Sequence, residues 1–322
     1  MVNYKDAIKN TNAYQTVLKD NEASRLSHTY LLISEDMDYA KEFSKMLSKI
    51  ILRLDDFSAG NVKLEKDIHP DVIIYGEKDK IKTLDVAEIA SEVFVRPYES
   101  DRKVYILLNM NDANEEAQNK LLKTIEEPPE SAFFILASKT ERKLLQTVLS
   151  RAKKIELDAL KQDVIKNMLL SVGVNEKEAN ICSACSAGVF SRANRMATDK
   201  EFLNLYQNIF KCLYKMNSSR DVLEFTCLFN QKNINKEELA DLFMSIVRDV
   251  MMAKAGTYEL VANSHKLDEL KLIAGTFSFE ALYKIIEYCL QLKEDLVYNT
   301  NVVASIDEFL LKLVEVKVKC KK

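Results

Sequence analysis

Short apolar runs alternate with helical patterns through the first half of the chain, and this alternation limits the possible folds more than any other feature. Runs typical of buried strands occupy residues 30–33, 72–75, 104–108, 133–137 and 154–157. Helical patterns lie between them, at residues 39–54, 83–95, 115–126 and 141–149. Strands and helices in this order join by right-handed crossovers. The sequence therefore predicts a mostly parallel sheet with helices on both faces.

The chain changes character near residue 130. All four prolines precede this point, and the proline-free remainder follows helical periodicity, with Gly173 and Gly188 as expected helix ends. Segments 239–253 and 279–296 carry too many apolar residues for one solvated face, so they should pack on each other or on a neighbouring chain. We predict an α/β domain over residues 1–158, a small helical domain over 159–204 and an all-α domain over 205–322.

Composition narrows the functional class. The chain has 322 residues, 47% of them hydrophobic and 30% charged, which is typical of globular proteins with room for two or three domains. A formal net charge of -3 predicts no strong nucleic-acid binding by this chain alone, since affinity for a phosphate backbone depends on basic charge. No apolar run approaches the roughly 20 residues that span a bilayer, so we expect no membrane contact and a cytoplasmic location.

Six cysteines fall in the second half, and only Cys182 and Cys185 have paired spacing. Redox pairs of this spacing normally open a helix after a strand, whereas these two lie inside a helical pattern and share one face. We expect reduced, buried thiols.

Residues 28–43, with the sequence HTYLLISEDMDYAKEF, lie where a nucleotide-binding domain of this layout keeps its phosphate loop, and they contain no glycine. Such a loop needs glycines so that backbone N–H groups can curl around phosphate oxygens. It also needs a lysine for charge and a Ser or Thr hydroxyl for magnesium. The sequence thus predicts a domain built like an ATPase that cannot hold phosphate.

Several segments together resemble the delta-prime subunits of the bacterial DNA polymerase III clamp loader, which are members of the AAA+ superfamily. The likeness runs through RLSHTYLLIS (25–34), HPDVIIYGE (69–77), KVYILLNMNDANEEAQNKLLKTIEEPP (103–129) and AFFILASKTERKLLQTVLSRAKKIEL (132–157). AQNKLLKTIEEPP followed by LLQTVLSR is the specific part, and YNTNVVASIDEFLLKL (298–313) is a weaker match to the terminal helix. The resemblance implies a RecA-like AAA+ domain, a helical lid and a helical collar that oligomerises.

In register with this family, Lys41 occupies the position of the phosphate-loop lysine. Glu42 replaces the hydroxyl residue, and the loop itself carries Glu35, Asp36, Asp38 and Ala40. One carboxylate about 6 Å from a phosphate charge costs roughly 3 kcal/mol at an effective dielectric constant near 20. We therefore expect no bound nucleotide, and we interpret Lys41 as a solvated helix lysine.

The other parts of a nucleotide site are also altered. The strand that should end in two catalytic carboxylates ends in LLNMN (107–111), and Asp112 lies too far along, so no metal is expected. Ser138 falls near the position of the residue that senses the terminal phosphate, but we interpret it as a strand-end cap. In the lid segment 188–193, Ser191 takes the place of a sensing arginine, and Arg192 is one position off.

Ser150 and Arg151 retain a family motif, Ser-Arg-Cys, with Ala152 in place of the cysteine. The resemblance implies that Arg151 reaches across a subunit junction toward ATP held by the adjacent motor subunit. A guanidinium suits this role because it is permanently charged and contacts phosphate in bidentate fashion. The alternative is a surface arginine that is paired with a carboxylate.

Many family members carry a four-cysteine zinc module before the His-Pro-Asp segment. This chain has no cysteine between residues 53 and 68, which excludes tetrahedral thiolate ligation there. His69 has no partner ligand, so we expect a turn residue ahead of Pro70.

Three hypotheses follow. The first is a non-catalytic clamp-loader subunit without a cofactor. It would join motor (gamma/tau) and delta subunits in a pentamer that loads the sliding clamp on primed DNA. The second is an ATPase that uses an unorthodox loop around Lys41. The third is a related AAA+ scaffold in replication or DNA repair.

Overall fold

The computed structural model describes residues 4–231, 236–297 and 301–320. The chain divides into two compact units, one formed by Met1–Val164 with Gly188–Ser191 and the other by Ile165–Ala187 with Arg192–Lys322. The predicted boundaries at residues 158 and 204 stay a prediction.

The first unit is built on a five-stranded parallel sheet in the order β2-β3-β4-β1-β5. The strands match the five runs predicted from the sequence: β1 (Thr29–Ile33), β2 (Val72–Tyr75), β3 (Lys103–Leu107), β4 (Ala132–Ser138) and β5 (Lys153–Glu156). The central strands β3 and β4 are buried along their whole length, as expected when helices cover both faces. The predicted α/β fold class is confirmed.

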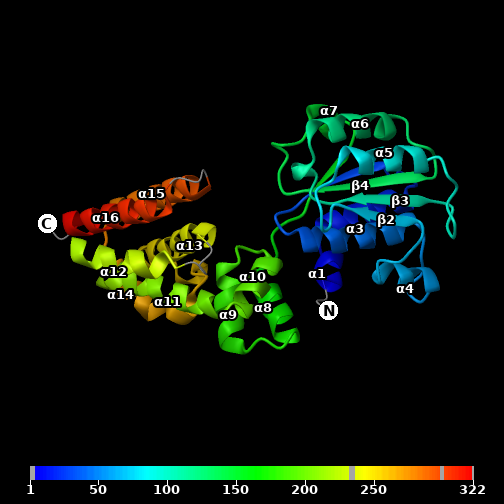
Figure 1. Cartoon of the computed structure of the whole chain (residues 1–322). Coiled ribbons are helices and arrows are strands. Elements are labelled where there is room, and N and C mark those ends of the chain that lie inside the picture. Colours follow the sequence, from blue (N-terminus) through cyan, green and yellow to red (C-terminus); the bar gives the residue numbers. More distant parts are fainter. Residues whose placement is uncertain (1–3, 232–235, 298–300, 321–322) are drawn as a thin grey trace. The chain divides into compact units, whose positions relative to one another are not determined.

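Helices lie on both faces of the sheet (Figure 1). One face carries α5 (Thr83–Glu92), α6 (Glu115–Glu126) and α7 (Gln146–Leu149). The other carries α1 (Lys5–Lys9), α3 (Met37–Ile51) and α2 (Asn12–Glu22), which packs on α3. A seventh helix, α4 (Ala59–Glu65), and a short 3-10 turn, η1 (Met110–Asp112), complete the unit.

The predicted helix over residues 141–149 is wrong in its first half, because α7 begins only at Gln146. The side chain of Gln118 in α6 explains the difference. Its amide donates to Lys143 O at 3.0 Å and its carbonyl oxygen accepts from Leu145 N at 2.9 Å. Leu145 is consequently held in an extended conformation, with ψ 140°. A tertiary contact here overrides local helix propensity.

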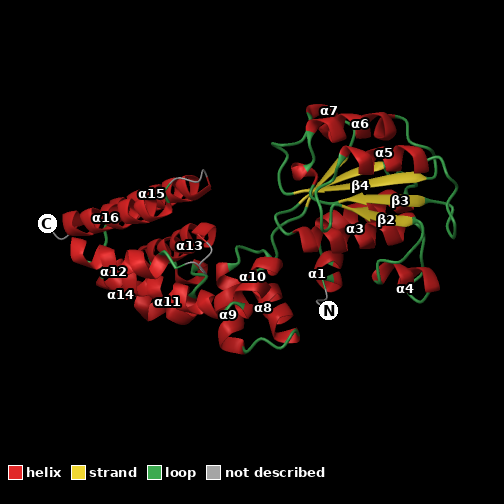
Figure 2. Cartoon of the chain, in the orientation of Figure 1, coloured by secondary structure: helices red, strands yellow, loops and turns green. Residues whose placement is uncertain are grey.

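Helices make up the second unit in the part that the structure describes (Figure 2). They are α8 (Gln162–Ser171), α9 (Glu176–Cys185), α10 (Phe190–Thr198), α11 (Lys200–Lys215), α12 (Ser219–Phe229), α13 (Lys236–Ala255), α14 (Leu267–Ala274), α15 (Phe279–Val297) and α16 (Val302–Cys320), with 3-10 turns η2 (Tyr258–Leu260) and η3 (Ser264–Lys266). The first residues of α8 and α10 belong to the first unit. Within this unit α13 packs against α11, α14 and α15, and α16 packs against α12 and α15. No helix among the described residues is long and apolar enough to cross a membrane.

Gly173 and Gly188 follow the ends of α8 and α9, as the sequence predicted, with φ of +91° and +83°. Both lie in the left-handed region that glycine adopts without strain. At Gly188 a side chain would also collide with Ala159, since an added Cβ would come within 2.5 Å of the Ala159 Cβ.

Candidate functional site

The start of α3, where a phosphate loop would bind its ligand, is occupied by the side chain of Asp36. Its Oδ1 accepts hydrogen bonds from the backbone N–H groups of Asp38 at 3.1 Å and Tyr39 at 3.2 Å. Its carbonyl oxygen takes the N–H of Ala40 at 2.9 Å. The first turn of a helix offers unpaired N–H groups that attract anions. Here the chain's own carboxylate has already taken that place.

Asp36 also joins this helix start to the lid segment predicted from the sequence. Its second oxygen, Oδ2, accepts from the backbone N–H of Ser191 at 3.0 Å, across 155 positions of sequence. Ser34 closes the loop from the other side, because its hydroxyl donates to Asp36 O and accepts from Asp36 N. Asp36 is only 3% exposed. A phosphate would have to displace a buried carboxylate that already accepts three N–H bonds.

Aromatic rings pack beside this loop. Tyr4 stacks on Tyr39 with ring centroids 5.7 Å apart, and the ring of Phe190 meets Tyr4 edge-on at 5.6 Å. All three rings are buried. Burial, with smaller contributions from Asp158 and Asp36, raises the pKa of Tyr39 to about 12, so its phenol stays neutral. The trio ties the N-terminal segment, α3 and the start of α10 into one apolar cluster.

Lys41 is not the solvated lysine that the sequence predicted. Its ammonium group bonds Asp67 at 2.7 Å and Glu77 at 2.9 Å, and only 14% of its side chain is exposed. Burial alone would lower the pKa of Lys41, but the hydrogen bonds to Asp67 and Glu77 raise it above its ordinary value. Lys41 therefore acts as a charged anchor, because its ammonium group holds the two loops that carry Asp67 and Glu77. These two carboxylates already neutralise its charge.

The remaining residues that the sequence predicted for the phosphate-loop position lie around the same helix start. Glu35 is exposed, and Ala40 is fully buried. Glu42 forms an ion pair with Lys45 at 3.2 Å. Loss of solvent and the nearby charge of Asp36 raise the pKa of Asp38. The loop thus adds negative charge where a nucleotide needs positive charge.

Amides occupy the strand ends where catalytic carboxylates would stand. Asn109, in a left-handed conformation with φ 54°, donates to Gly76 O at 2.9 Å. The carbonyl oxygen of Asn111 accepts from Lys139 N at 3.0 Å and lies 3.3 Å from Ser138 Oγ. Ser138 is fully buried and donates to Thr140 O, as a strand-end cap does. These side chains cross-link the ends of β2, β3 and β4.

The His-Pro-Asp segment has a structural role. Asp71 is fully buried, and its carboxylate accepts the backbone N–H groups of Tyr98, Glu99 and Ser100 at 2.6 to 2.9 Å. Burial lowers the pKa of His69, whose Nδ1 accepts from Asp71 N at 3.1 Å. Over residues 4–231, 236–297 and 301–320, no three His, Cys, Asp or Glu side chains are grouped to hold a metal.

Arg151 lies exposed in the turn between α7 and β5. Its Nη2 pairs with Glu126 Oε1 at 2.5 Å, where α6 ends, and its Nη1 donates to Thr147 O at 3.0 Å and Ser150 Oγ at 3.3 Å. The side chain of Arg151 is 36% exposed and that of Glu126 is 43% exposed. None of these contacts involves the loop at the start of α3. The guanidinium can therefore be offered to another molecule after one solvent-exposed ion pair and two exposed hydrogen bonds are exchanged.

Cys182 and Cys185 are buried free thiols in α9, as the sequence predicted. Burial, reinforced by Glu178, raises the pKa of Cys182 to about 12, and burial likewise raises that of Cys185. A redox pair needs a readily formed thiolate, so these two serve packing.

Two side chains of the site were not predicted from the sequence: Glu126, which pairs with Arg151, and Asp36 in its role as the cap of α3. Glu126 lies in the quoted TIEEPP segment, but nothing local indicated that it meets Arg151. The role of Asp36 did carry a local signal, since an aspartate just before a helical pattern is a typical N-cap.

Comparison with known proteins supports the family suggested by the sequence. Two family models match: one described as "DNA polymerase III, delta subunit" over residues 9–161, and one described as "DNA polymerase III, delta subunit, C terminal" over residues 200–312. DNA polymerase III subunit delta' of Bacillus subtilis is 24% identical over 94% of this chain and 94% of its own length.

Two further relatives come from Buchnera aphidicola. The delta' subunit of subspecies Baizongia pistaciae is 25% identical over 69% of each chain. The gamma subunit of subspecies Schizaphis graminum is 25% identical over 78% of this chain and 77% of its own. A solved gamma subunit-related protein of Thermotoga maritima aligns with 94% of this chain and 99% of its own at 19% identity and a TM-score of 0.48, which is too distant to add to the assignment.

The two family models together span most of the chain, one on the α/β region and one on the helical region. The delta' relative from Bacillus subtilis extends the match through both. The parallel sheet and the helical second half agree with the fold predicted for that family. The chain therefore belongs to the DNA polymerase III delta-subunit family.

Proposed function

We propose that this chain is the delta'-type subunit of a DNA polymerase III clamp loader and does not hydrolyse ATP itself. It would assemble with motor (gamma/tau) subunits and a delta subunit, and the complex would load the sliding clamp on primed DNA. Its own contribution to ATP hydrolysis would be Arg151, supplied to the site of the adjacent motor subunit. Family membership and relatives named delta' and gamma support the assembly.

One observation carries the proposal that its own site is inactive: the carboxylate of Asp36 accepts the N–H groups that would hold a phosphate. Displacing it would break hydrogen bonds to a charged group, each worth about 1.5–3 kcal/mol. Lys41 offers no replacement contact to a phosphate, since Asp67 and Glu77 already bind its ammonium group. The same contacts count against an ATPase built around Lys41.

The exposed position of Arg151 supports its action on a neighbour. Arginine supplied from a second subunit stabilises the charge that develops on the transferred phosphoryl group, and it contributes about 10³- to 10⁵-fold to turnover where this has been measured. The Arg151 ion pair with Glu126 is solvent-exposed and therefore weak, so exchange for a phosphate contact costs little. Hydrolysis would then depend on correct assembly.

The inactive site is tested by calorimetric titration of the isolated chain with magnesium and ATP. We expect no heat of binding up to millimolar nucleotide. Micromolar affinity would reject the proposal and favour the ATPase around Lys41.

The arginine is tested by Arg151→Ala in the reconstituted complex, with clamp- and DNA-stimulated ATP turnover as the readout. We expect a loss of about 10³-fold at the site next to this subunit. Arg142→Ala, at an exposed arginine in the same connection, is the matched control and should leave turnover unchanged. Unchanged turnover in the Arg151 variant would reject the role in trans.

Co-purification separates this proposal from an AAA+ scaffold in DNA repair. Tagged chain mixed with motor and delta subunits should elute as one complex whose mass gives the stoichiometry. Failure to retain the motor subunit would favour the scaffold.

A further inference from the structure

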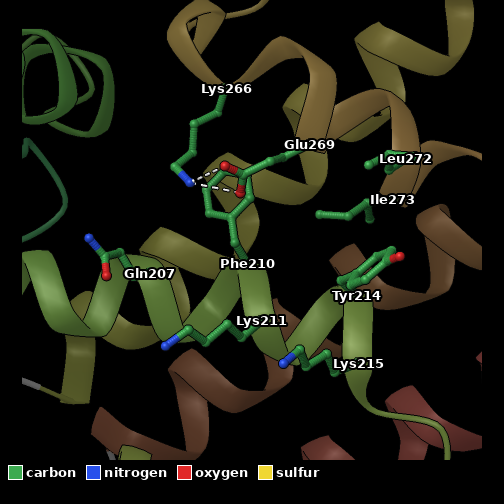
Figure 3. A pocket seen from close by; sticks show the side chains of 9 residues that line it. All are labelled: Gln207, Phe210, Lys211, Tyr214, Lys215, Lys266, Glu269, Leu272 and Ile273. Atoms are coloured by element: carbon green, nitrogen blue, oxygen red, sulfur yellow. Dashed lines mark hydrogen bonds and ion pairs between the residues drawn. The ribbon is translucent and has the colours of Figure 1, made fainter.

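The helical unit contains a pocket between α11 and the η3–α14 segment (Figure 3). Its volume is about 380 Å³. The helix α11 lines one side with residues spaced three and four apart, which therefore share one face. They are Gln207, Phe210, Lys211, Tyr214 and Lys215. Lys266, Glu269, Leu272 and Ile273 line the other side.

The pocket has an apolar floor and an exposed apolar rim. Phe210 and Ile273 are 3% and 2% exposed, so they form the floor. Tyr214 and Leu272 are 51% and 60% exposed and stand at the edge. A volume of this size accommodates one or two large apolar side chains, and each would gain about 1.5–3 kcal/mol on full burial. The far end of α11 is fixed, because the buried Lys317 ammonium donates to Leu213 O and Tyr214 O at 2.7 Å.

The charges around the pocket are predominantly positive. Lys266 pairs with Glu269 at 2.6 Å and also lies over the Phe210 ring, 4.8 Å from its centroid. Lys211 and Lys215 form no ion pair or hydrogen bond of their side chains within the described residues. Two uncompensated ammonium groups thus border an apolar cavity on a chain whose overall charge is negative.

We propose that this pocket binds a short acidic peptide segment of a partner protein, with an aromatic or aliphatic anchor in the cavity and carboxylates on Lys211 and Lys215. Apolar grooves between helices commonly take one face of such a segment. Complementary charges at the rim set orientation and partner choice. The site is independent of Arg151 and of nucleotide.

Single-stranded nucleic acid fits the same charges less well. Such strands are bound by successive exposed aromatic rings on which bases stack. This pocket presents one exposed ring, Tyr214, whereas the other ring, Phe210, is buried beneath the Lys266 ammonium. A recessed apolar floor matches a side chain better than it matches a stacked base.

Fluorescence anisotropy with the full chain tests the proposal. The probe is a fluorescein-labelled 12-residue peptide with one phenylalanine and one leucine four residues apart among glutamates. We expect binding that is weakened at least about tenfold by Lys211→Glu combined with Lys215→Glu, because like charges then face each other. Leu272→Ala should weaken it about fivefold through lost apolar contact.

The control variant reverses two exposed lysines of the first unit, Lys78→Glu with Lys80→Glu, which changes net charge equally and should leave binding intact. A peptide with serine in place of phenylalanine and leucine should bind at least about tenfold more weakly. The proposal is overturned if the Lys211–Lys215 variant binds the peptide as wild type does. It is also overturned if a 20-nucleotide oligo-dT binds more tightly than the peptide, or if sedimentation shows a dimer that this variant disperses.

Discussion

The start of α3 and the turn that carries Arg151 each hold one charged side chain at a position where an AAA+ fold handles nucleotide. The two side chains differ in how deeply they are buried and in how firmly their hydrogen-bond partners hold them. At α3 the anion is Asp36, buried and held by three backbone N–H groups. At the turn the cation is Arg151, exposed and held by one exposed carboxylate, a carbonyl and a hydroxyl. Replacing the internal contacts of Asp36 by contacts to an outside ligand therefore requires much free energy, whereas replacing those of Arg151 requires little.

Under the proposed function, one domain would lose nucleotide binding and keep a group that acts on a neighbouring subunit. At the start of α3 the position that an anion would take is filled from within by one N-capping aspartate, in a loop that also lacks glycines. Keeping a group that acts on a neighbour requires that its internal partners stay exposed and weak. Four substitutions test this contrast, and they are given from the largest expected effect to the smallest.

Arg151→Lys tests whether the planar geometry of the guanidinium matters at position 151, in addition to its charge. Lysine keeps the charge but loses the planar, bidentate fork. We expect stimulated ATP turnover at the site next to this subunit to fall roughly 100-fold, about 3 kcal/mol of transition-state stabilisation. Turnover near wild type would mean that charge alone suffices at this position.

Asp36→Ala tests whether the α3 site is closed as firmly as its burial indicates. Loss of an N-cap costs about 0.5–2 kcal/mol, and an unsatisfied Ser191 N–H adds about 1–3 kcal/mol. We expect the free energy of unfolding to fall by about 2 kcal/mol in urea titration. Glu35→Ala, at the exposed neighbour, should change it by less than about 0.5 kcal/mol. The variant should still bind no ATP, since the loop lacks glycines.

Lys41→Ala tests the charged anchor beside that site. Hydrogen bonds from Lys41 and Lys45 outweigh burial and lower the pKa of Asp67 below 3.8. The stabilisation from Asp67 is then fully present above pH 3.8 and is lost as the pH falls through its folded pKa. We expect a loss of about 1 kcal/mol that is equal at pH 7 and pH 5 and shrinks toward pH 3.

The control for this variant is Lys49→Ala on the same helix, whose partner Asp56 is mostly exposed. It should cost less than about 0.5 kcal/mol. If the loss in Lys41→Ala were independent of pH, packing of the lysine stem would explain it, and the anchor would not be electrostatic.

Glu126→Gln tests the weakest contact in the comparison. Because both side chains are exposed, we expect stability to change by less than about 0.5 kcal/mol. Release of Arg151 should tighten association with the motor subunit about twofold, as measured by biolayer interferometry, while Glu127→Gln has no effect. A loss of ATP turnover comparable to that of Arg151→Ala would instead make Glu126 a positioning residue.

Much of the fold could be predicted from the sequence because strands and helices follow local periodicity. All five strands and the bounds of α6 match the prediction. The error at residues 141–145 has a non-local cause, since Gln118 binds that backbone from another helix. The helices α1, α2 and α4 were not predicted from the sequence.

By itself the sequence determined which residue types the start of α3 lacks, because glycines and a hydroxyl residue are either present at a position or absent. It also placed Arg151 in a recognisable motif. Only the tertiary structure decided which groups meet: Ser191 N–H bonds Asp36, the carboxylates of Asp67 and Glu77 pair with Lys41, and Glu126 pairs with Arg151. These partners come from distant parts of the chain, so their meeting depends on how loops pack and not on local pattern.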